Sequence, residues 1–254
     1  MTTSLPEQLC QSKEAGTWFS ATHWSVVLAA GHGDAACRQQ ALETLCRTYW
    51  QPIYTWLRCS GHDVPDAQDL TQGFFAHLLA AGAFSGLGAE KGKFRSFLLK
   101  SLQHFLADER DRCGAAKRGS GSACLPLDEQ AAEAHYLEEA NSGRTPEASF
   151  DRRWALLLLD RAFLALQQEF LASGRTEQFT ELAVFLAAEG GAQEYADAAN
   201  RLRMTPGAVA VAVHRLRARY RDCIRGEIAQ TVNSAAEARE EMRYLLEVLC
   251  RDPI

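Results

Sequence analysis

Arginine and lysine side chains gather in two stretches of this sequence, and their chemistry suits the phosphates and base edges of a nucleic acid. Residues 195–225 contain seven arginines against two aspartates, and residues 91–118 contain eight lysines and arginines against three acidic residues. A guanidinium group can neutralise a phosphate, or read a guanine through two parallel hydrogen bonds. Each stretch is therefore a candidate nucleic-acid contact.

The charge of the whole chain limits how such contacts would work. The 254 residues carry a formal net charge of -5. A protein that coats nucleic acid by bulk attraction usually has a large positive excess, so this charge argues against that class of protein. Binding would instead depend on the two local basic stretches.

The elements that carry these stretches are predicted to be helices. Apolar residues recur at three- and four-residue spacing through most of the chain, and no run alternates for long, which predicts an all-α fold without a sheet. A first helix starts near Ala41, is expected to kink or break at Pro52, and ends at Gly61. A second helix opens with Asp63 as its cap, and a third, amphipathic helix follows from Phe94.

The basic stretch near residue 200 is typical of two helices joined by a tight turn. Residues 194–202 form a short helix with small side chains on one side, and Thr205 and Pro206 suit the cap and first position of a longer helix. The residues of this longer helix that are predicted to point inward are Val209, Val213, Leu216 and Tyr220. The pattern favours a helix-turn-helix, whose second helix lies in the major groove of DNA. The alternative is an ordinary helical hairpin with a solvated basic face.

Three segments together resemble a known family. Residues 195–225 resemble the fourth conserved region of extracytoplasmic-function (ECF) sigma factors, members of the sigma-70 family that direct bacterial RNA polymerase to promoters. Residues 66–75, DAQDLTQGFF, look like that family's D-x-x-D-L-x-Q-x-x-F helix, and residues 91–98, KGKFRSFL, are similar to its G-x-F-R-x-W-L segment. Residues 22–28, THWSVVL, look like the start of a sigma group with a long linker. Phe97 stands where tryptophan is more usual, and Ala210 where a lysine is common.

The resemblance implies a non-enzymatic specificity subunit that uses three groups of residues. The clamp helices of the polymerase's largest subunit would be bound by Asp66, Asp69, Leu70, Gln72 and Phe75. The minus-ten promoter element would be recognised and melted by Lys91, Lys93, Phe94, Arg95, Ser96, Lys100, Gln103 and His104. The minus-thirty-five element would be contacted by Thr205, Gly207, Ala208, Ala210, Val211, His214, Arg215, Arg217 and Arg219. The flap of the second polymerase subunit and an inhibitory regulator are further candidate partners.

Helical spacing divides the residues after Phe94 between core and surface. Phe97 has the spacing of a core residue, although an aromatic ring in a basic segment could also stack on an unpaired base. The residues that fall on the more exposed face, and are preferred as contacts, are Ser96, Lys100, Gln103 and His104.

These elements suggest two helical domains joined by a flexible linker. The expected order is a disordered N-terminus, a domain for polymerase and the minus-ten element, an acidic linker with at most a short helix, a helix-turn-helix domain, and a C-terminal helical extension. These parts span residues 1–16, 17–113, 114–149, 150–230 and 231–254, in that order. The sequence assigns no role to the extension.

The sequence favours a cytoplasmic protein that needs no cofactor, no metal and no membrane span. Residues 1–16 lack a basic start followed by an apolar run, and the apolar stretches are too short to cross a bilayer. The eight cysteines form no CxxC pair and have no histidine at zinc-ligand spacing. Unpaired thiols in a reducing compartment are expected.

Two other functions fit parts of the sequence. A metal-dependent phosphohydrolase could cage its metal with His62, Asp63, Asp66, Asp69 and His77, although no further His/Asp pair and no phosphate-binding loop follows. A stand-alone helix-turn-helix regulator would bind duplex DNA tightly by itself, as a dimer on a palindrome. Binding to core polymerase separates a sigma factor from both.

Overall fold

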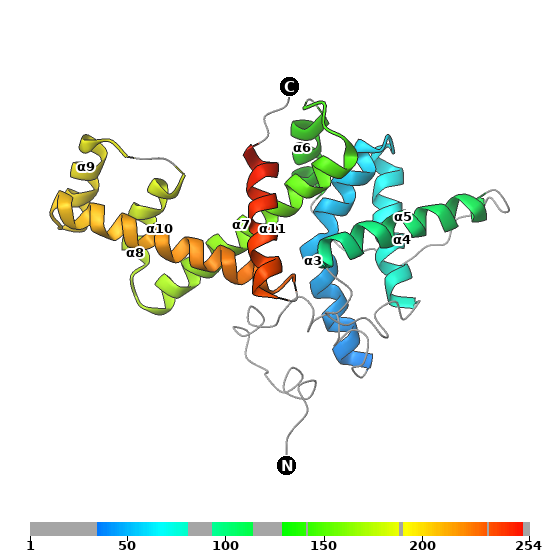
Figure 1. Ribbon diagram of the computed structural model, residues 1–254, viewed down its shortest axis with the longest axis horizontal. Coiled ribbons are helices and arrows are strands. Elements are labelled where there is room, and N and C mark those ends of the chain that lie inside the picture. Colours follow the sequence, from blue (N-terminus) through cyan, green and yellow to red (C-terminus); the bar gives the residue numbers. More distant parts are fainter. Residues whose placement is uncertain are drawn as a thin grey trace, which may run out of the picture. The chain divides into compact units, whose positions relative to one another are not determined.

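The computed structural model of this chain describes residues 35–80, 93–113, 129–140, 142–187, 190–232 and 234–250. These residues contain helices and no strand, which confirms the all-α prediction (Figure 1). In chain order the elements are α3 (Ala35–Cys59), α4 (Val64–Ala80), α5 (Phe94–Cys113), α6 (Glu129–Ala140), α7 (Pro146–Ala172), α8 (Thr176–Ala183), the 3-10 helix η3 (Val184–Leu186), α9 (Ala192–Leu202), α10 (Pro206–Ala229) and α11 (Ala235–Cys250). The predicted N-terminal segment, the motif at 22–28, Lys91 and residues 114–128 lie outside the described residues.

Internal contacts divide the chain into two compact units. The first unit contains Met1–Ala155 together with Ala229–Ile254, and the second contains Leu156–Ile228. One division falls inside α7 and the other near the end of α10. Helix α11 therefore belongs to the first unit, although it follows the second unit in the sequence.

Aromatic side chains form the centre of the first unit. Tyr49 of α3 stacks on Trp154 of α7 with 4.9 Å between ring centroids, and Phe94 of α5 meets Tyr49 edge-on at 5.1 Å. Phe74 of α4 lies 5.9 Å from Phe105 of α5. Burying a large apolar side chain stabilises a fold by about 1.5–3 kcal/mol. This cluster therefore holds α3, α4, α5 and the start of α7 together.

Helix α3 runs through Pro52 without ending, so of the predicted kink or break the structure excludes the break. A proline inside a helix removes one backbone hydrogen bond and crowds the preceding turn, which costs about 3 kcal/mol. Here the neighbouring residues Tyr49, Ile53 and Leu57 are buried, and their burial outweighs that cost. The predicted end at Gly61 is confirmed, because this residue follows the helix with a φ of 93°, a conformation that favours glycine.

Side chains cap two helices where the sequence predicts it. At the start of α4, Asp63 Oδ1 accepts a hydrogen bond of 2.9 Å from the backbone N–H of Asp66. At the start of α10, Thr205 Oγ1 accepts one of 3.2 Å from the N–H of Ala208, and Pro206 is the first helical residue. Each cap satisfies an N–H that has no partner within its own helix.

The second half of the predicted linker is a helix that is held against α3. Glu133 of α6 accepts hydrogen bonds from Arg58 Nη2 at 2.7 Å and Nε at 3.1 Å, and from the Tyr54 hydroxyl at 2.7 Å. The Arg58 guanidinium also lies over the ring of Tyr136, 4.1 Å from its centroid. Residues 129–140 therefore form the one short helix that the prediction allowed within the linker, and they are part of the first unit.

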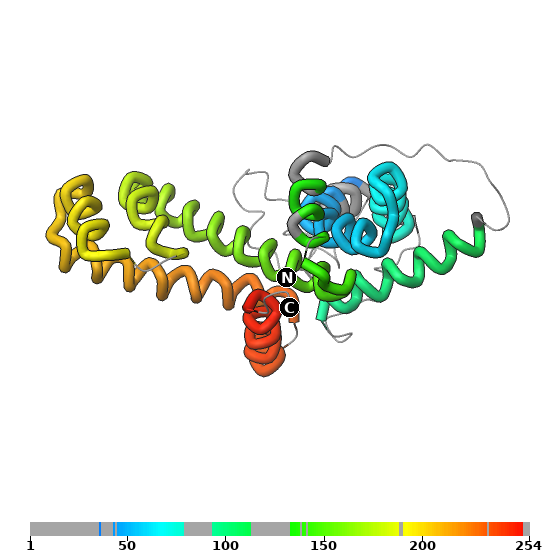
Figure 2. The backbone as a smooth tube through the Cα atoms, turned by 90° about the horizontal axis from the view of Figure 1, so that it is seen from above, coloured from blue at the N-terminus to red at the C-terminus, as the bar shows by residue number. Residues whose placement is uncertain are grey.

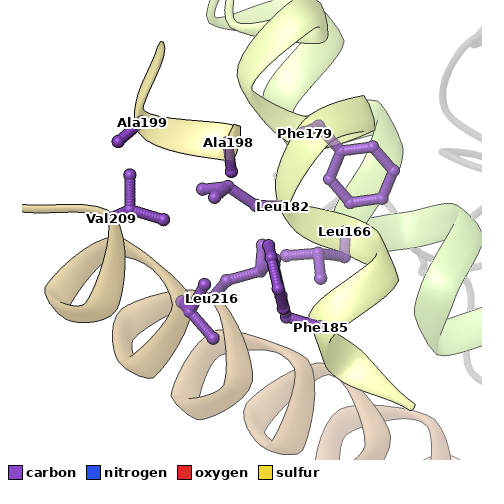
Figure 3. Close-up of a cluster of buried hydrophobic side chains, with 9 residues drawn as sticks. Leu166, Phe179, Leu182, Phe185, Ala198, Ala199, Val209 and Leu216 are labelled. Atoms are coloured by element: carbon purple, nitrogen blue, oxygen red, sulfur yellow. The ribbon is translucent and has the colours of Figure 1, made fainter. Parts of the chain in front are cut away.

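The second unit packs α7 to α10 around one apolar cluster (Figure 3). Its members are Leu166, Phe179, Leu182, Phe185, Ala198, Ala199, Val209, Val213 and Leu216. The small side chains Ala198 and Ala199 come from α9 and, as the sequence predicts, allow this short helix to approach its neighbours closely. The ring of Phe185 also stacks on Tyr195 of α9 at 4.9 Å.

Candidate nucleic-acid interface

Helix α10 follows α9 in the second unit (Figure 2). The residues between them are Arg203, Met204 and Thr205. Arg203 adopts a left-handed conformation with φ 53° and ψ 43°, which ends α9 and changes the direction of the chain. The N–H of Met204 donates to the carbonyl oxygen of Ala199 at 2.9 Å and closes the end of α9. The capped start of α10 follows directly. The short helix, tight turn and long helix that the sequence predicts here are present.

Helix α10 has one face in the core and another toward solvent. Val209, Val213 and Leu216 are buried and Tyr220 is half-buried, as predicted. The predicted contact residues that are exposed are Thr205, Gly207, Ala210, Val211, His214, Arg215 and Arg219. Ala208 and Arg217 are half-buried. The first half of α10 therefore offers a continuous surface of small, apolar and cationic groups.

Two of the predicted arginine contacts are bound to the protein itself. Arg217 donates hydrogen bonds from Nε and Nη2 to the carbonyl oxygen of Phe185, at 2.9 and 2.7 Å. Arg219 forms a paired hydrogen bond with Glu169 of α7, at 2.8 and 2.6 Å, and this carboxylate raises the pKa of Arg219. Both guanidinium groups thus hold α10 to its neighbours, and only Arg219 is also exposed.

A groove of about 610 Å³ runs beside the exposed face of α10. Its lining includes Phe170 and Arg175 from the end of α7 and the turn after it, and Val211, Arg215 and Arg219 from α10. Val211 is 51% exposed on the outside of the helix. The groove and the first half of α10 form one surface.

The predicted minus-ten residues on α5 fall into an exposed set and a buried set. Ser96, Lys100, Gln103 and His104 are exposed, as predicted from their spacing, and Phe97 is half-buried. In contrast, Phe94 is fully buried among the aromatic rings of the first unit, and Arg95 is only 9% exposed. Neither of these two side chains reaches the surface in this conformation.

Arg95 is the centre of a network of charges inside the first unit. It pairs with Asp151 of α7, and its Nε donates to Glu241 of α11 at 3.0 Å. Lys93 Nζ lies 2.8 Å from the other oxygen of Glu241. The ring of Tyr244 lies 4.7 Å from the guanidinium carbon of Arg95, and its hydroxyl donates to Asp151. Lys93 and Arg95 are thus neutralised by partners far away in the sequence.

The protonation of this network follows from its partners. Burial alone would raise the pKa of Glu241, but the hydrogen bonds and charges of Arg95 and Lys93 outweigh burial and lower it. Burial and the hydrogen bond to Asp151 raise the pKa of Tyr244 to about 12. At neutral pH Glu241 is therefore ionised and the phenol of Tyr244 is neutral.

The predicted polymerase-docking residues share helix α4 but differ in exposure. Asp66 and Asp69 are exposed, and Leu70 and Gln72 are half-buried. Phe75 is only 3% exposed and lies 5.4 Å from Phe74, so it serves the core and offers no surface to a partner. The surface that remains is acidic and polar.

Three structural observations bear on the other functional classes. In the described ranges, no three His, Cys, Asp or Glu side chains lie close enough to hold a metal ion, and no helix has the length and hydropathy to cross a membrane. Cys46, Cys59, Cys223 and Cys250 are free thiols, as predicted for unpaired cysteines. Comparison with protein families, curated proteins and solved structures finds no match for this chain.

Sequence reasoning missed the acceptors that hold the arginines. Asp151 and Glu241 lie 56 and 146 residues from Arg95, and the acceptor for Arg217 is a backbone carbonyl. One signal for Glu241 is present in the sequence. It occupies the same face of α11 as Leu245 and Val248, the face that is buried, and an acidic residue on an apolar face needs a cationic partner.

Proposed function

We propose that this protein is an alternative sigma factor of the ECF type, which binds core RNA polymerase and directs transcription initiation through the minus-ten and minus-thirty-five elements. The observation that carries the proposal is the exposed face of α10. Ala210, Val211, His214 and Arg215 lie on it, while the opposite face is fixed in the core of the second unit. A helix that is fixed on one side can present such a surface to the major groove.

The start of α10 is also suited to a phosphate. Pro206 has no N–H and Thr205 takes up those of Ala208 and Val209, so the N–H of the exposed Gly207 is the one that an anion can reach at the start of the helix. The N-terminus of a helix carries a partial positive charge, which attracts anions. Arg215 adds a cation two turns further along. Together these groups support backbone contacts at the start of the helix and base contacts along it.

The first unit supplies the second part of the proposal. Ser96, Lys100, Gln103 and His104 are exposed along α5, and these types of side chain can hydrogen-bond bases and phosphates. Asp66 and Asp69 are exposed three residues apart on α4 and suit a basic partner helix. An acidic chain with local basic surfaces would bind promoters weakly by itself and depend on polymerase for most phosphate contacts.

The first experiment tests docking on polymerase. Tagged full-length protein is incubated with core polymerase that lacks a sigma subunit, and we expect the two to co-purify. The double variant Asp69→Asn, Gln72→Ala should retain less polymerase. Asp108→Asn, which removes one exposed charge from α5, should retain as much as the wild type. Undiminished retention by the double variant would reject the α4 surface.

The second experiment tests promoter recognition. Core polymerase with this protein is used for in vitro transcription on genomic DNA, and we expect initiation at a small set of related promoters. Arg215→Ala should weaken use of such a promoter by about 1–3 kcal/mol if Arg215 reads a base. A protein that ignores core polymerase but binds a palindromic duplex tightly by itself would instead be a stand-alone regulator.

A further inference from the structure

Helix α11 covers cations that the proposed function assigns to the minus-ten element. Glu241 is 1% exposed, accepts a hydrogen bond from Nε of Arg95 and forms an ion pair with Lys93. The segment before α11 is attached at the same place, since the N–H of Phe94 donates to the carbonyl oxygen of Thr231 at 3.1 Å. Ser234 then caps α11 by accepting from Glu237 at 3.1 Å. The extension is thus fixed directly over the start of α5.

A carboxylate and a phosphate compete for the same donors. Guanidinium and ammonium groups bind both anions through short, charge-assisted hydrogen bonds. Glu241 accepts from Nε of Arg95 and pairs with Nζ of Lys93, so it competes with a nucleic-acid phosphate for these two groups. Docking of α11 therefore weakens the binding of a phosphate to these two groups.

The contact is built to be reversible. Only Glu241, Leu245 and Val248 of α11 are buried, and Leu246 on another face is 53% exposed. Elements with few buried apolar contacts open at low free energy. If α11 leaves, Arg95 keeps its ion pair with Asp151, and Lys93, already 28% exposed, moves into water. Undocking therefore leaves no isolated charge inside the first unit.

We infer that α11 is an autoinhibitory helix, whose Glu241 takes the place of a nucleic-acid phosphate at Lys93 and Arg95 and keeps the start of α5 closed until the helix is displaced. The inference rests on the proposed function, because it assigns these cations to nucleic acid. Coupling between sites is reciprocal, so any partner that displaces α11 raises the affinity of the start of α5 for nucleic acid by the same factor.

The test compares two full-length variants with the same change in net charge. Glu241→Lys places a cation against Lys93 and Arg95 and should expel α11, whereas Glu247→Lys makes the same change at an exposed position of the same helix. The probe is a fluorescein-labelled oligothymidylate of about 20 nucleotides, followed by anisotropy. We expect Glu241→Lys to bind at least about tenfold more tightly than Glu247→Lys.

The salt dependence gives a second readout. Each phosphate neutralised on a single strand contributes about 0.7 to the slope of log affinity against log salt. Undocking frees Lys93, whereas Arg95 keeps its ion pair with Asp151, so the slope for Glu241→Lys should be steeper by at least about 0.7 than for Glu247→Lys. Equal affinities and equal slopes for the two variants would overturn the inference.

A third measurement uses the wild-type protein and does not depend on a variant that folds. Hydrogen exchange of α11 amides is compared with and without saturating oligothymidylate. Faster exchange in the complex supports displacement, and unchanged exchange in a saturated complex overturns it. The proposed function is tested separately by core-polymerase binding and run-off transcription with the wild type. If the wild type supports transcription but the two variants bind oligothymidylate with equal affinity and equal salt slope, only the inference is rejected. If the wild type does not bind core polymerase, the proposed function is rejected.

Discussion

Arg217 donates two hydrogen bonds to the carbonyl oxygen of Phe185, a residue 32 positions earlier in the chain. The carbonyl belongs to η3, and the arginine lies on α10, so this contact ties two elements of the second unit together. An arginine that a sequence pattern assigns to DNA is here bound to the protein backbone.

Because of this contact, the roles of Arg217 and Arg215 can be distinguished by experiment. Arg217→Ala leaves the Phe185 carbonyl without these donors and should lower the free energy of unfolding by about 1–3 kcal/mol. Arg215→Ala removes an exposed side chain and should change stability by less than about 0.5 kcal/mol. Urea denaturation followed by circular dichroism measures both. Equal stabilities would show that the Phe185 contact contributes little.

Gly190 is predicted to accept no larger residue. A Cβ at this position would lie 2.4 Å from Cε1 of Phe185, whose ring is itself stacked on Tyr195. Gly190→Ala must displace that ring and should lower the free energy of unfolding by about 1–3 kcal/mol. Gly226→Ala is the matched control, because it adds the same methyl group where no atom lies within 4 Å. The control should stabilise α10 by about 0.5–1 kcal/mol, as judged by thermal unfolding.

Glu133 is predicted to hold α6 in place. Glu133→Ala leaves the hydroxyl of the buried Tyr54 without its acceptor and leaves Arg58 only its hydrogen bond to the carbonyl oxygen of His62, which should cost about 1–3 kcal/mol. Amides in residues 129–140 should then exchange faster with deuterium. Glu147→Ala, at an exposed position of α7, should leave their exchange unchanged. Identical protection of α6 in both variants would contradict a stabilising role for Glu133.

Acid is predicted to weaken the Arg95 network through Glu241. The pKa of this carboxyl is lowered in the folded state from an ordinary value of 4.5, so the unfolded chain binds the proton more readily. The stability that Glu241 contributes is complete above pH 4.5 and is lost as the pH falls through the lower folded-state pKa. The other ionisable groups that face Glu241 are Lys93, Arg95 and, through Arg95, Asp151 and Tyr244.

The measurement is the free energy of unfolding from about pH 6 to about pH 3. It should fall less steeply for Glu241→Gln than for the wild type, whereas Glu247→Gln, which alters an exposed carboxylate, should follow the wild type. A wild-type curve as flat as that of Glu241→Gln would show that the ion pairs of Glu241 do not stabilise the fold.

Local features of the fold were predictable because they depend on neighbouring residues. Asp63 and Thr205 cap the helices that follow them, and Val209, Val213 and Leu216 form the expected inward face. The exposed positions on α5 also follow from helical spacing. These features are set within one or two turns of helix, the range over which a sequence pattern carries information.

Features that depend on distant residues were not predictable from the pattern. Arg95 looks like a surface cation in its own segment, and it is buried only because Asp151 and Glu241 neutralise it. Pro52 looks like a helix breaker until the burial of its neighbours is known. The acidic segment near Glu133 looks like a tether until Arg58 is seen to bind it. In each case tertiary contacts outweigh the local preference.

The packing of Phe150 and Trp154 decides where the polypeptide can be cut. Both rings are fully buried, and Trp154 lies against Tyr49 and Phe94 from earlier helices. A fragment that starts at residue 150 would carry these rings away from their partners and display them to water, which promotes self-association. The complementary fragment would keep a void where the indole had been. Neither fragment is expected to form a stable, soluble monomer when it is expressed alone.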